Sequence, residues 1–132
     1  MTPAPDKIRL LIADDQPTIL RGLSLMLGTE ADVEVVGLAS DGVEAVEMAK
    51  ELRPDVIIMD LKMPRLTGVE ATRAITLADA DIKIVVLTTF VSDEMVFDAM
   101  RAGAQAYLLK DTDEQKVLKT VRAVHRGDSV PV

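Results

Sequence analysis

Short apolar segments alternate five times with segments of helical periodicity, and this alternation constrains the fold more than any other feature of the chain. The apolar segments hold four to seven residues each and cover 8–13, 33–39, 56–59, 82–87 and 106–109. Segments this short, rich in Val, Ile and Leu, are typical of strands buried on both faces. After each of them, apolar residues recur at the spacing of an amphipathic helix, roughly over 17–27, 43–52, 69–77, 93–102 and 113–126. We therefore predict an α/β fold of the (βα)5 type, with a doubly wound, five-stranded parallel sheet covered by helices on both faces.

Length, charge and residue content narrow the class of protein. The 132 residues suit one domain with a core of its own. The absence of Cys excludes disulfides, thiol nucleophiles and cysteine-bound metals. A formal charge of −7 disfavours nucleic-acid binding by this segment. No apolar run is as long as a membrane span, and residues 1–7 lack the apolar part of a signal peptide, so we expect a cytoplasmic protein that does not enter the membrane.

The segment Arg53–Pro64 contains the most informative strand end. Its apolar run stops at Asp60, and Pro64 prevents a simple continuation of the strand. In open parallel sheets, ligands bind at the carboxyl ends of the strands. An Asp in this position is more often a helix cap or a turn residue than a functional group. The other strand ends therefore decide between these interpretations.

Asp14 and Asp15 follow the first predicted strand, Thr88 follows the fourth and Lys110 follows the fifth. Taken singly, they have ordinary explanations as helix caps, a β-branched strand residue and a solvated charge. Together at one sheet edge, the carboxylates would repel one another unless a cation neutralised them. A hard divalent ion such as Mg²⁺ (or Mn²⁺) meets that need, and the Lys and Thr side chains would hold an oxyanion. The set predicts phosphoryl transfer with one carboxylate as the nucleophile.

The same residues resemble a known family. The Asp14-Asp15 pair, the run Asp60-Leu61-Lys62-Met63-Pro64 with Gly68 beyond it, Thr88, and Tyr107 three residues before Lys110 are similar to the receiver domain of bacterial two-component response regulators. Residues 103–111 further resemble the subfamily with a LuxR-type (NarL/FixJ-like) output domain. The resemblance covers 7–127 and implies a flavodoxin-like or CheY-like sheet with strand order 2-1-3-4-5. Residues 128–132 would begin a linker or tail, with the effector domain absent.

The resemblance implies a role for each site residue. Asp60 would be the phosphoacceptor, taking a phosphoryl group from a sensor histidine kinase or a small phosphodonor. Mg²⁺ would be bound by Asp15, Asp60 and the backbone carbonyl of Lys62, with Asp14 acting through water. Lys110 would pair with the phosphoryl oxygens.

Other positions would transmit or time the response. Thr88 and Tyr107 would move together in the active state. Lys62 and Phe90, two positions beyond Asp60 and Thr88, would influence how long the phosphoryl group persists. Many receivers have a cis proline after the site Lys, but Asp111 stands here, so we expect a trans peptide bond.

The predicted function is a phosphorylation-dependent switch that alters the surface of the fourth helix and fifth strand. It would be no enzyme beyond Mg²⁺-dependent self-phosphorylation and autodephosphorylation. The partners would be a histidine kinase, a second copy after phosphorylation, and DNA only through an absent helix-turn-helix domain. Phe97 and Leu25 point away from the predicted core and are candidate contact residues.

Three alternatives remain in view at this stage. A receiver that acts alone by protein docking is the alternative left open by the missing effector domain. A Mg²⁺-dependent phosphatase would want a second Asp where Lys62 stands. A doubly wound nucleotide-binding domain would want a glycine-rich loop where Asp14 and Asp15 lie.

Overall fold

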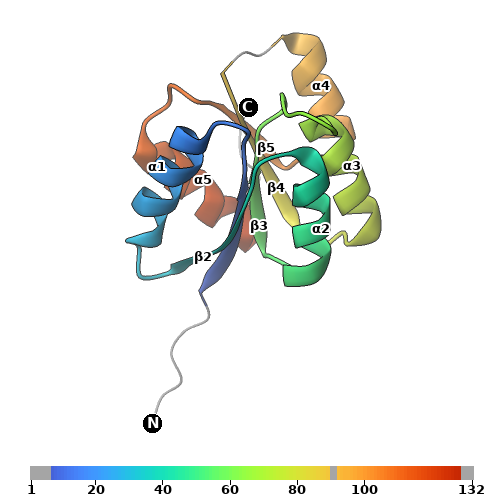
Figure 1. Ribbon diagram of the computed structural model, residues 1–132. Coiled ribbons are helices and arrows are strands. Elements are labelled where there is room, and N and C mark those ends of the chain that lie inside the picture. Colours follow the sequence, from blue (N-terminus) through green and yellow to red (C-terminus); the bar gives the residue numbers. More distant parts are fainter. Residues whose placement is uncertain (1–6, 90–91, 129–132) are drawn as a thin grey trace.

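The computed structural model describes residues 7–89 and 92–128, which form one parallel sheet flanked by helices (Figure 1). The strands are β1 (Ile8–Ala13), β2 (Val33–Ala39), β3 (Val56–Met59), β4 (Lys83–Thr88) and β5 (Ala106–Leu109). The helices are α1 (Pro17–Gly28), α2 (Gly42–Leu52), α3 (Gly68–Ala78), α4 (Asp93–Arg101) and α5 (Glu114–Arg126). The sheet order is β2-β1-β3-β4-β5. Both the predicted (βα)5 fold and the predicted strand order are confirmed.

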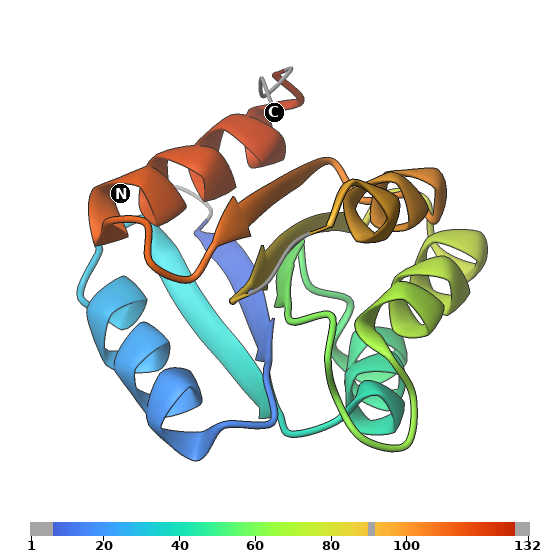
Figure 2. The same ribbon diagram turned by 90° about the horizontal axis from the view of Figure 1, so that it is seen from above.

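The sheet divides the apolar core into two layers. Seen from above, α1 and α5 cover one face, and α2, α3 and α4 cover the other (Figure 2). Alternate strand residues enter opposite layers, so Val56 and Ile58 pack beneath α1 and α5, while Ile57 and Met59 pack beneath α2, α3 and α4. All four side chains are buried, as expected for the central strand of a doubly covered sheet.

The two layers differ in composition. The layer beneath α2, α3 and α4 contains buried Met59 and Met63, with Met48, Met95 and Met100 packed against it. The layer beneath α1 and α5 consists of Ile, Leu, Val and Ala side chains, with one Met against it among the described residues, Met26. Flexible thioether side chains thus gather on one side of the sheet.

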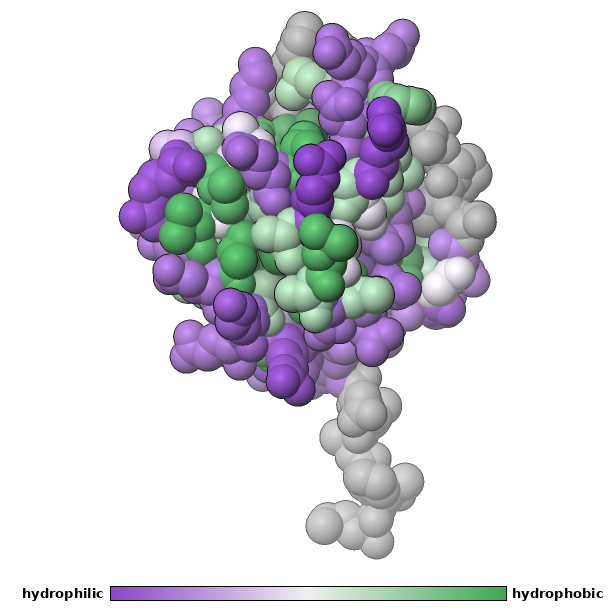
Figure 3. Space-filling model, turned by 90° about the vertical axis from the view of Figure 1, so that its right-hand side faces the viewer, coloured by the Kyte–Doolittle hydropathy of each residue, from purple (hydrophilic) through white to green (hydrophobic). Residues whose placement is uncertain are grey.

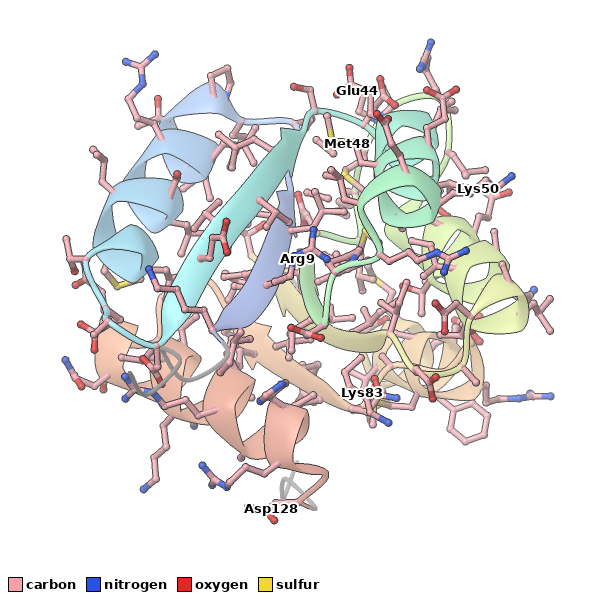
Figure 4. All side chains as sticks on the ribbon, turned by 90° about the horizontal axis from the view of Figure 1, so that it is seen from below. Arg9, Glu44, Met48, Lys50, Lys83 and Asp128 are labelled. Atoms are coloured by element: carbon pink, nitrogen blue, oxygen red, sulfur yellow. The ribbon has the colours of Figure 1, made fainter. Side chains whose placement is uncertain are left out.

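Capping interactions explain where several helices begin and end. Asp41 accepts the backbone N–H of Glu44 at the start of α2, and Thr67 and Glu70 form a reciprocal capping box at the start of α3. At the other end of α2, Arg9 reaches across from β1 and donates to the carbonyl of Leu52 at 2.7 Å (Figure 4). These local interactions fix both ends of α2 against the sheet.

One strand boundary differs from the prediction. The expected strand 82–87 is observed one residue later, at Lys83–Thr88, because Ile82 still belongs to the turn after α3 and donates to the carbonyl of Asp79. Thr88 therefore lies inside β4, paired with Leu109 of β5. No helix in the described part of the chain has the length and apolar character needed to cross a membrane.

Candidate functional site

Strand pairing brings Asp14 and Asp60 side by side. Ala13 and Met59 are partners in the β1–β3 ladder, and each is followed directly by an Asp. The ladder continues one step further, since the N–H of Asp60 donates to the carbonyl of Ala13 at 2.9 Å. Both carboxyl groups therefore emerge at the carboxyl edge of the sheet, where ligands bind in folds of this type.

Three carboxylates and one ammonium group meet at this edge. Oxygens of Asp14, Asp15 and Asp60 lie within 4.8 Å of one another. The Nζ atom of Lys110 lies 2.6 Å from Asp14 Oδ2 and 3.3 Å from Asp60 Oδ2. Asp14 and Asp60 are buried, whereas Asp15 is exposed to solvent. The prediction that the sheet gathers these four side chains is confirmed.

The electrostatics of this cluster favour a bound cation. Burial and the neighbouring charge of Asp14 raise the pKa of Asp60, against the opposing effects of Lys110 and the backbone N–H of Lys62. Burial alone would lower the pKa of Lys110, but its contacts with Asp14 and Asp60 outweigh burial and raise it. Three carboxylates against one ammonium leave a formal charge of −2, which one divalent ion would cancel. Carboxylate oxygens are also the ligands that Mg²⁺ prefers, so these residues fit such an ion.

Helix capping does not account for the acidic pair. The N-cap residue of α1 is Gln16, and its side chain makes no capping hydrogen bond. Asp14 instead accepts the backbone N–H of Gln16 through Oδ1 at 2.8 Å, which leaves Oδ2 directed at Lys110. The side-chain oxygen of Gln16 lies 3.3 Å from Lys110 Nζ, a contact that the sequence did not indicate.

The loop between β3 and α3, residues 61–67, is held close to the cluster by two glycines. A Cβ atom at Gly68 would lie 2.1 Å from the carbonyl oxygen of Asp60, and one at Gly42 would lie 2.0 Å from that of Leu66. Only glycine permits these approaches. The loop, which carries Lys62, is therefore packed directly against the backbone of Asp60 on one side and the start of α2 on the other.

An ion pair strengthens this attachment. Arg65 has a positive φ of 69°, and its Nε lies 3.1 Å from Asp41 Oδ2. A backbone hydrogen bond from Glu44 and the contact with Arg65 lower the pKa of Asp41. Asp41 thus caps α2 and anchors the loop at once, a role that sequence spacing does not reveal because the partners are 24 positions apart.

The remaining predicted site residues lie around the cluster. Thr88 is buried at the end of β4, and its carbonyl accepts the backbone N–H of Lys110 at 2.8 Å. Tyr107 is partly buried against the layer beneath α2, α3 and α4. The Lys62 side chain is exposed. Phe90 lies outside the described residues. The Lys110–Asp111 peptide bond is trans, as expected, since no cis bond occurs among the described residues.

The two candidate contact residues are exposed. Leu25 on α1 is 68% exposed and Phe97 on α4 is 60% exposed. The guanidinium of Arg101 lies 5.3 Å from the centre of the Phe97 ring, within the range of a cation–π contact. Beside the cluster, an open hollow of about 590 Å³ is lined by Asp15, Lys62 and Met95 among others. Of the three acids of the cluster, Asp15 lines this hollow.

Fold and site together define a doubly wound α/β domain whose chemistry lies at the carboxyl ends of β1, β3 and β5 and suits a hard cation. The model of one family, the response regulator receiver domain, matches residues 10–122. The chain therefore belongs to the receiver domain family of response regulators.

Relatives and solved structures agree with this membership. The chain is 44% identical to the transcriptional regulatory protein LiaR of Bacillus subtilis over 92% of its own length and 57% of that protein. It is 42% identical to the response regulator protein VraR of Staphylococcus aureus over 93% of its length and 59% of that protein. The chain thus spans little more than half the length of these relatives.

Among solved structures, the receiver domain of the putative response regulator NarL from Mycobacterium tuberculosis superposes with a TM-score of 0.89 at 30% identity, covering 93% of this chain and 99% of that one. A LuxR-family response regulator from Aurantimonas gives 0.88 at 29% identity, covering 94% and 89%.

Proposed function

We propose that this chain is a phosphorylation-dependent signalling switch, in which Asp60 accepts a phosphoryl group from the phosphohistidine of a sensor histidine kinase or from a small phosphodonor. The observation that carries the proposal is the placement of a buried Asp60 carboxylate 3.3 Å from Lys110, with two further carboxylates within 4.8 Å. Phosphoryl transfer requires mainly positioning and neutralisation of charge, and this arrangement supplies both.

In the transfer, a carboxylate oxygen of Asp60 attacks the phosphorus atom, and the bond from phosphorus to the donor breaks. Asp15, Asp60 and the backbone carbonyl of Lys62 would hold Mg²⁺, with Asp14 acting through a water molecule. When bound, the ion would neutralise charge on the phosphoryl oxygens. Lys110, now in contact with Asp60, would pair with one of these oxygens, because an aspartyl phosphate extends the negative charge toward the ammonium.

The switch follows from the added charge. A phosphoryl group brings acceptor oxygens to the edge of the sheet, where the Thr88 hydroxyl would hydrogen-bond to it, and Tyr107 would turn inward behind Thr88. Inverting a 99:1 equilibrium takes about 5.5 kcal/mol of differential stabilisation. Two or three charge-assisted hydrogen bonds, at roughly 1.5–3 kcal/mol each, are of that size. The surface of α4 and β5 would change as a result.

The output of the switch would be transcription. The relatives LiaR and VraR are named as regulators, and this chain spans 57% and 59% of them. We assign residues 7–127 to the receiver and 128–132 to the start of a linker toward a DNA-binding helix-turn-helix domain.

Phosphorylation would promote dimerisation of this cytoplasmic protein. The acidic cluster would perform self-phosphorylation and autodephosphorylation, and Lys62 and Phe90 would tune the lifetime of the phosphoryl group.

Incubation with Mg²⁺ and acetyl phosphate tests the proposal. The mass of the native chain should increase by one phosphoryl group, and the increase should be absent in Asp60→Asn, which keeps the size of the side chain. Asp128→Asn is the matched control, because Asp128 is an exposed acid at the far end of α5 (Figure 4). Phosphorylation of Asp60→Asn to the level of the native chain would contradict the assignment.

A further inference from the structure

Gln16 is an exposed residue beside the acidic cluster, and the proposed function gives it no role. It leads from β1 into α1, which covers the face of the sheet opposite the apolar surface of α2 and α3 (Figure 3). Its side-chain oxygen Oε1 lies 3.3 Å from the Nζ atom of Lys110. Packing in the core does not hold an exposed side chain in one place. The hydrogen bond from Lys110 is therefore what orients the Gln16 side chain.

The ammonium group of Lys110 has three N–H donors, and its side chain is only 8% exposed. Three side-chain oxygens of the described residues lie near it: Asp14 Oδ2 at 2.6 Å, Asp60 Oδ2 at 3.3 Å and Gln16 Oε1 at 3.3 Å. Each N–H thus has one acceptor within reach. Leaving a buried donor without a partner is costly, so Gln16 supplies the acceptor that the two carboxylates do not.

Gln16 is joined to the cluster a second time through its backbone. Its N–H donates to Asp14 Oδ1 at 2.8 Å, while the other oxygen of that carboxylate contacts Lys110. Gln16, Asp14 and Lys110 therefore form a closed ring in which each residue contacts the other two. Such a ring restricts the ammonium more than one contact does, because moving Nζ away from either partner also disturbs the other contact.

The sequence around Gln16 favours this contact. Pro17 follows it at the first position of α1, and a residue before proline is held in the extended region, where Gln16 lies at φ −95° and ψ 110°. Gln16 is also the N-cap residue of α1, a position at which Ser, Thr, Asp or Asn usually accepts a backbone N–H of the first turn. The longer Gln side chain makes no such bond and reaches Lys110 instead.

We propose that Gln16 is a positioning residue for phosphoryl transfer, which holds the Lys110 ammonium beside Asp60 before the phosphodonor arrives. This inference rests on the proposed function. A positive group that is already in place when charge develops on the phosphoryl oxygens needs no reorganisation during the reaction. A neutral amide suits this task, because it orients the ammonium without cancelling its charge. Gln16 acts through Lys110, so the binding of Mg²⁺ should not depend on it.

NMR of the Lys110 ammonium group tests the positioning directly, without Mg²⁺ or a phosphodonor. An ammonium held by three acceptors should give a ¹H–¹⁵N signal that exchanges slowly with water, identified by its absence in Lys110→Arg. Gln16→Met keeps the length of the side chain and removes the acceptor, so exchange should become several-fold faster. Gln115→Met, at an exposed position on α5, is the matched control and should change nothing. Absence of the signal from the native chain, or unchanged exchange in Gln16→Met, would overturn the proposal.

The kinetics of phosphorylation by acetyl phosphate give an independent measurement. The maximal rate should fall about three-fold in Gln16→Met, as expected for the loss of a long contact at an exposed residue, while the half-saturating Mg²⁺ concentration stays the same. Gln115→Met should match the native rate.

Gln16→Asn separates positioning from a merely structural role in α1. Asn is a favoured N-cap residue but is too short to reach Lys110, so the Tm should rise while phosphorylation slows. A native rate in both Gln16→Met and Gln16→Asn would overturn the inference and leave Asp60 as the phosphoacceptor. Native chain that takes up no phosphoryl group would instead contradict the proposed function itself.

Discussion

Asp15 differs from the other two acids of the cluster in being exposed to solvent. Asp14 and Asp60 already share the ammonium of Lys110, so their charges are partly compensated without a metal. Asp15 contacts no cation in the described structure, which makes it the carboxylate with most to gain from a divalent ion. Substitution there should affect metal binding with little effect on the fold.

Thermal unfolding with and without Mg²⁺ checks this expectation. A ligand that binds only the folded state at 100 times its Kd adds about 2.7 kcal/mol of stability, so Mg²⁺ should raise the Tm of the native chain. The rise should be much smaller in Asp15→Asn and should persist in Asp128→Asn. An unchanged Mg²⁺ effect in Asp15→Asn would remove Asp15 from the proposed metal site.

Thr72 is a buried polar residue of α3 that lies outside the acidic cluster. Its side chain is fully buried, and its hydroxyl finds no hydrogen-bond partner among the described residues. An unsatisfied buried polar group costs about 1–3 kcal/mol, and an apolar group of the same shape removes that cost. Thr72→Val should therefore leave the free energy of unfolding unchanged or increase it, as measured by urea denaturation. Thr72→Ser should decrease it, because it keeps the hydroxyl and leaves a methyl-sized gap.

Residue types and spacing predicted the acidic cluster because Asp14 and Asp60 directly follow strands and Asp15 follows Asp14. Thr88 and Lys110 were predicted on the same grounds. The contacts of Gln16 with Lys110 and of Arg65 with Asp41 were not predicted, since both depend on how loops fold back over the sheet edge. Side-chain contacts of this kind have no period in the sequence.

At the scale of elements, the loop 61–67 is the most constrained connection near the site. Gly68→Ala would place a Cβ 2.1 Å from the carbonyl oxygen of Asp60, which forces the loop or the strand end to move. We expect a loss of more than about 1 kcal/mol in the free energy of unfolding and a smaller stabilisation by Mg²⁺.

Gly22→Ala is the matched control for that substitution. Gly22 lies within α1, and a Cβ there would meet no atom within 4 Å. Replacing a Gly inside a helix with Ala adds up to about 1 kcal/mol of stability. The two Gly→Ala variants should therefore shift the urea midpoint in opposite directions, and a shift in the same direction would show that close packing at Gly68 is not limiting.

Helix α5 is attached to the turn before β2 by Arg122, which contacts Asp32 at 2.8 Å through both Nε and Nη2. The hydrogen bonds from Arg122 lower the pKa of Asp32. The contribution of the Arg122–Asp32 ion pair to stability is therefore present above the unfolded-state pKa of Asp32. It is lost as the pH falls through the lowered pKa of Asp32 in the folded chain. Because the two side chains are 35% and 47% exposed, solvent screening keeps the contribution small.

Arg122→Gln should accordingly cost less than about 1 kcal/mol at pH 7. The difference from the native chain should shrink as the pH falls below about 4, because the unfolded chain then takes up a proton on Asp32 that the folded native chain still resists. Urea denaturation at pH 7 and pH 3 provides the comparison. A difference that stays constant over this range would mean that Arg122 acts through packing of its aliphatic part and not through the ion pair.

The elements themselves were predictable because hydrophobic period and turn residues agree along the chain. Four of the five strands, β1, β2, β3 and β5, have the bounds that the sequence predicts. The shift of β4 by one residue reflects a buried residue, Ile82, whose apolar character is shared by strand and turn. Burial determines which residues of the segment are apolar, and backbone hydrogen bonding determines the residue at which the strand begins.

At the scale of the whole molecule, the sheet separates the apolar core into two layers. Each strand sends alternate side chains into separate layers, and residues of α4 pack in the layer beneath α2, α3 and α4.

Methionine is distributed unequally between the two core layers, and this should make the layers differ in flexibility. Unbranched thioether chains adopt many shapes at similar energy, whereas β-branched Val and Ile are stiff. We therefore expect the layer around Met59, Met63 and Met95 to deform more readily than the layer beneath α1 and α5. Amide hydrogens of α4 should exchange with solvent faster than those of α5, even before any phosphoryl group arrives.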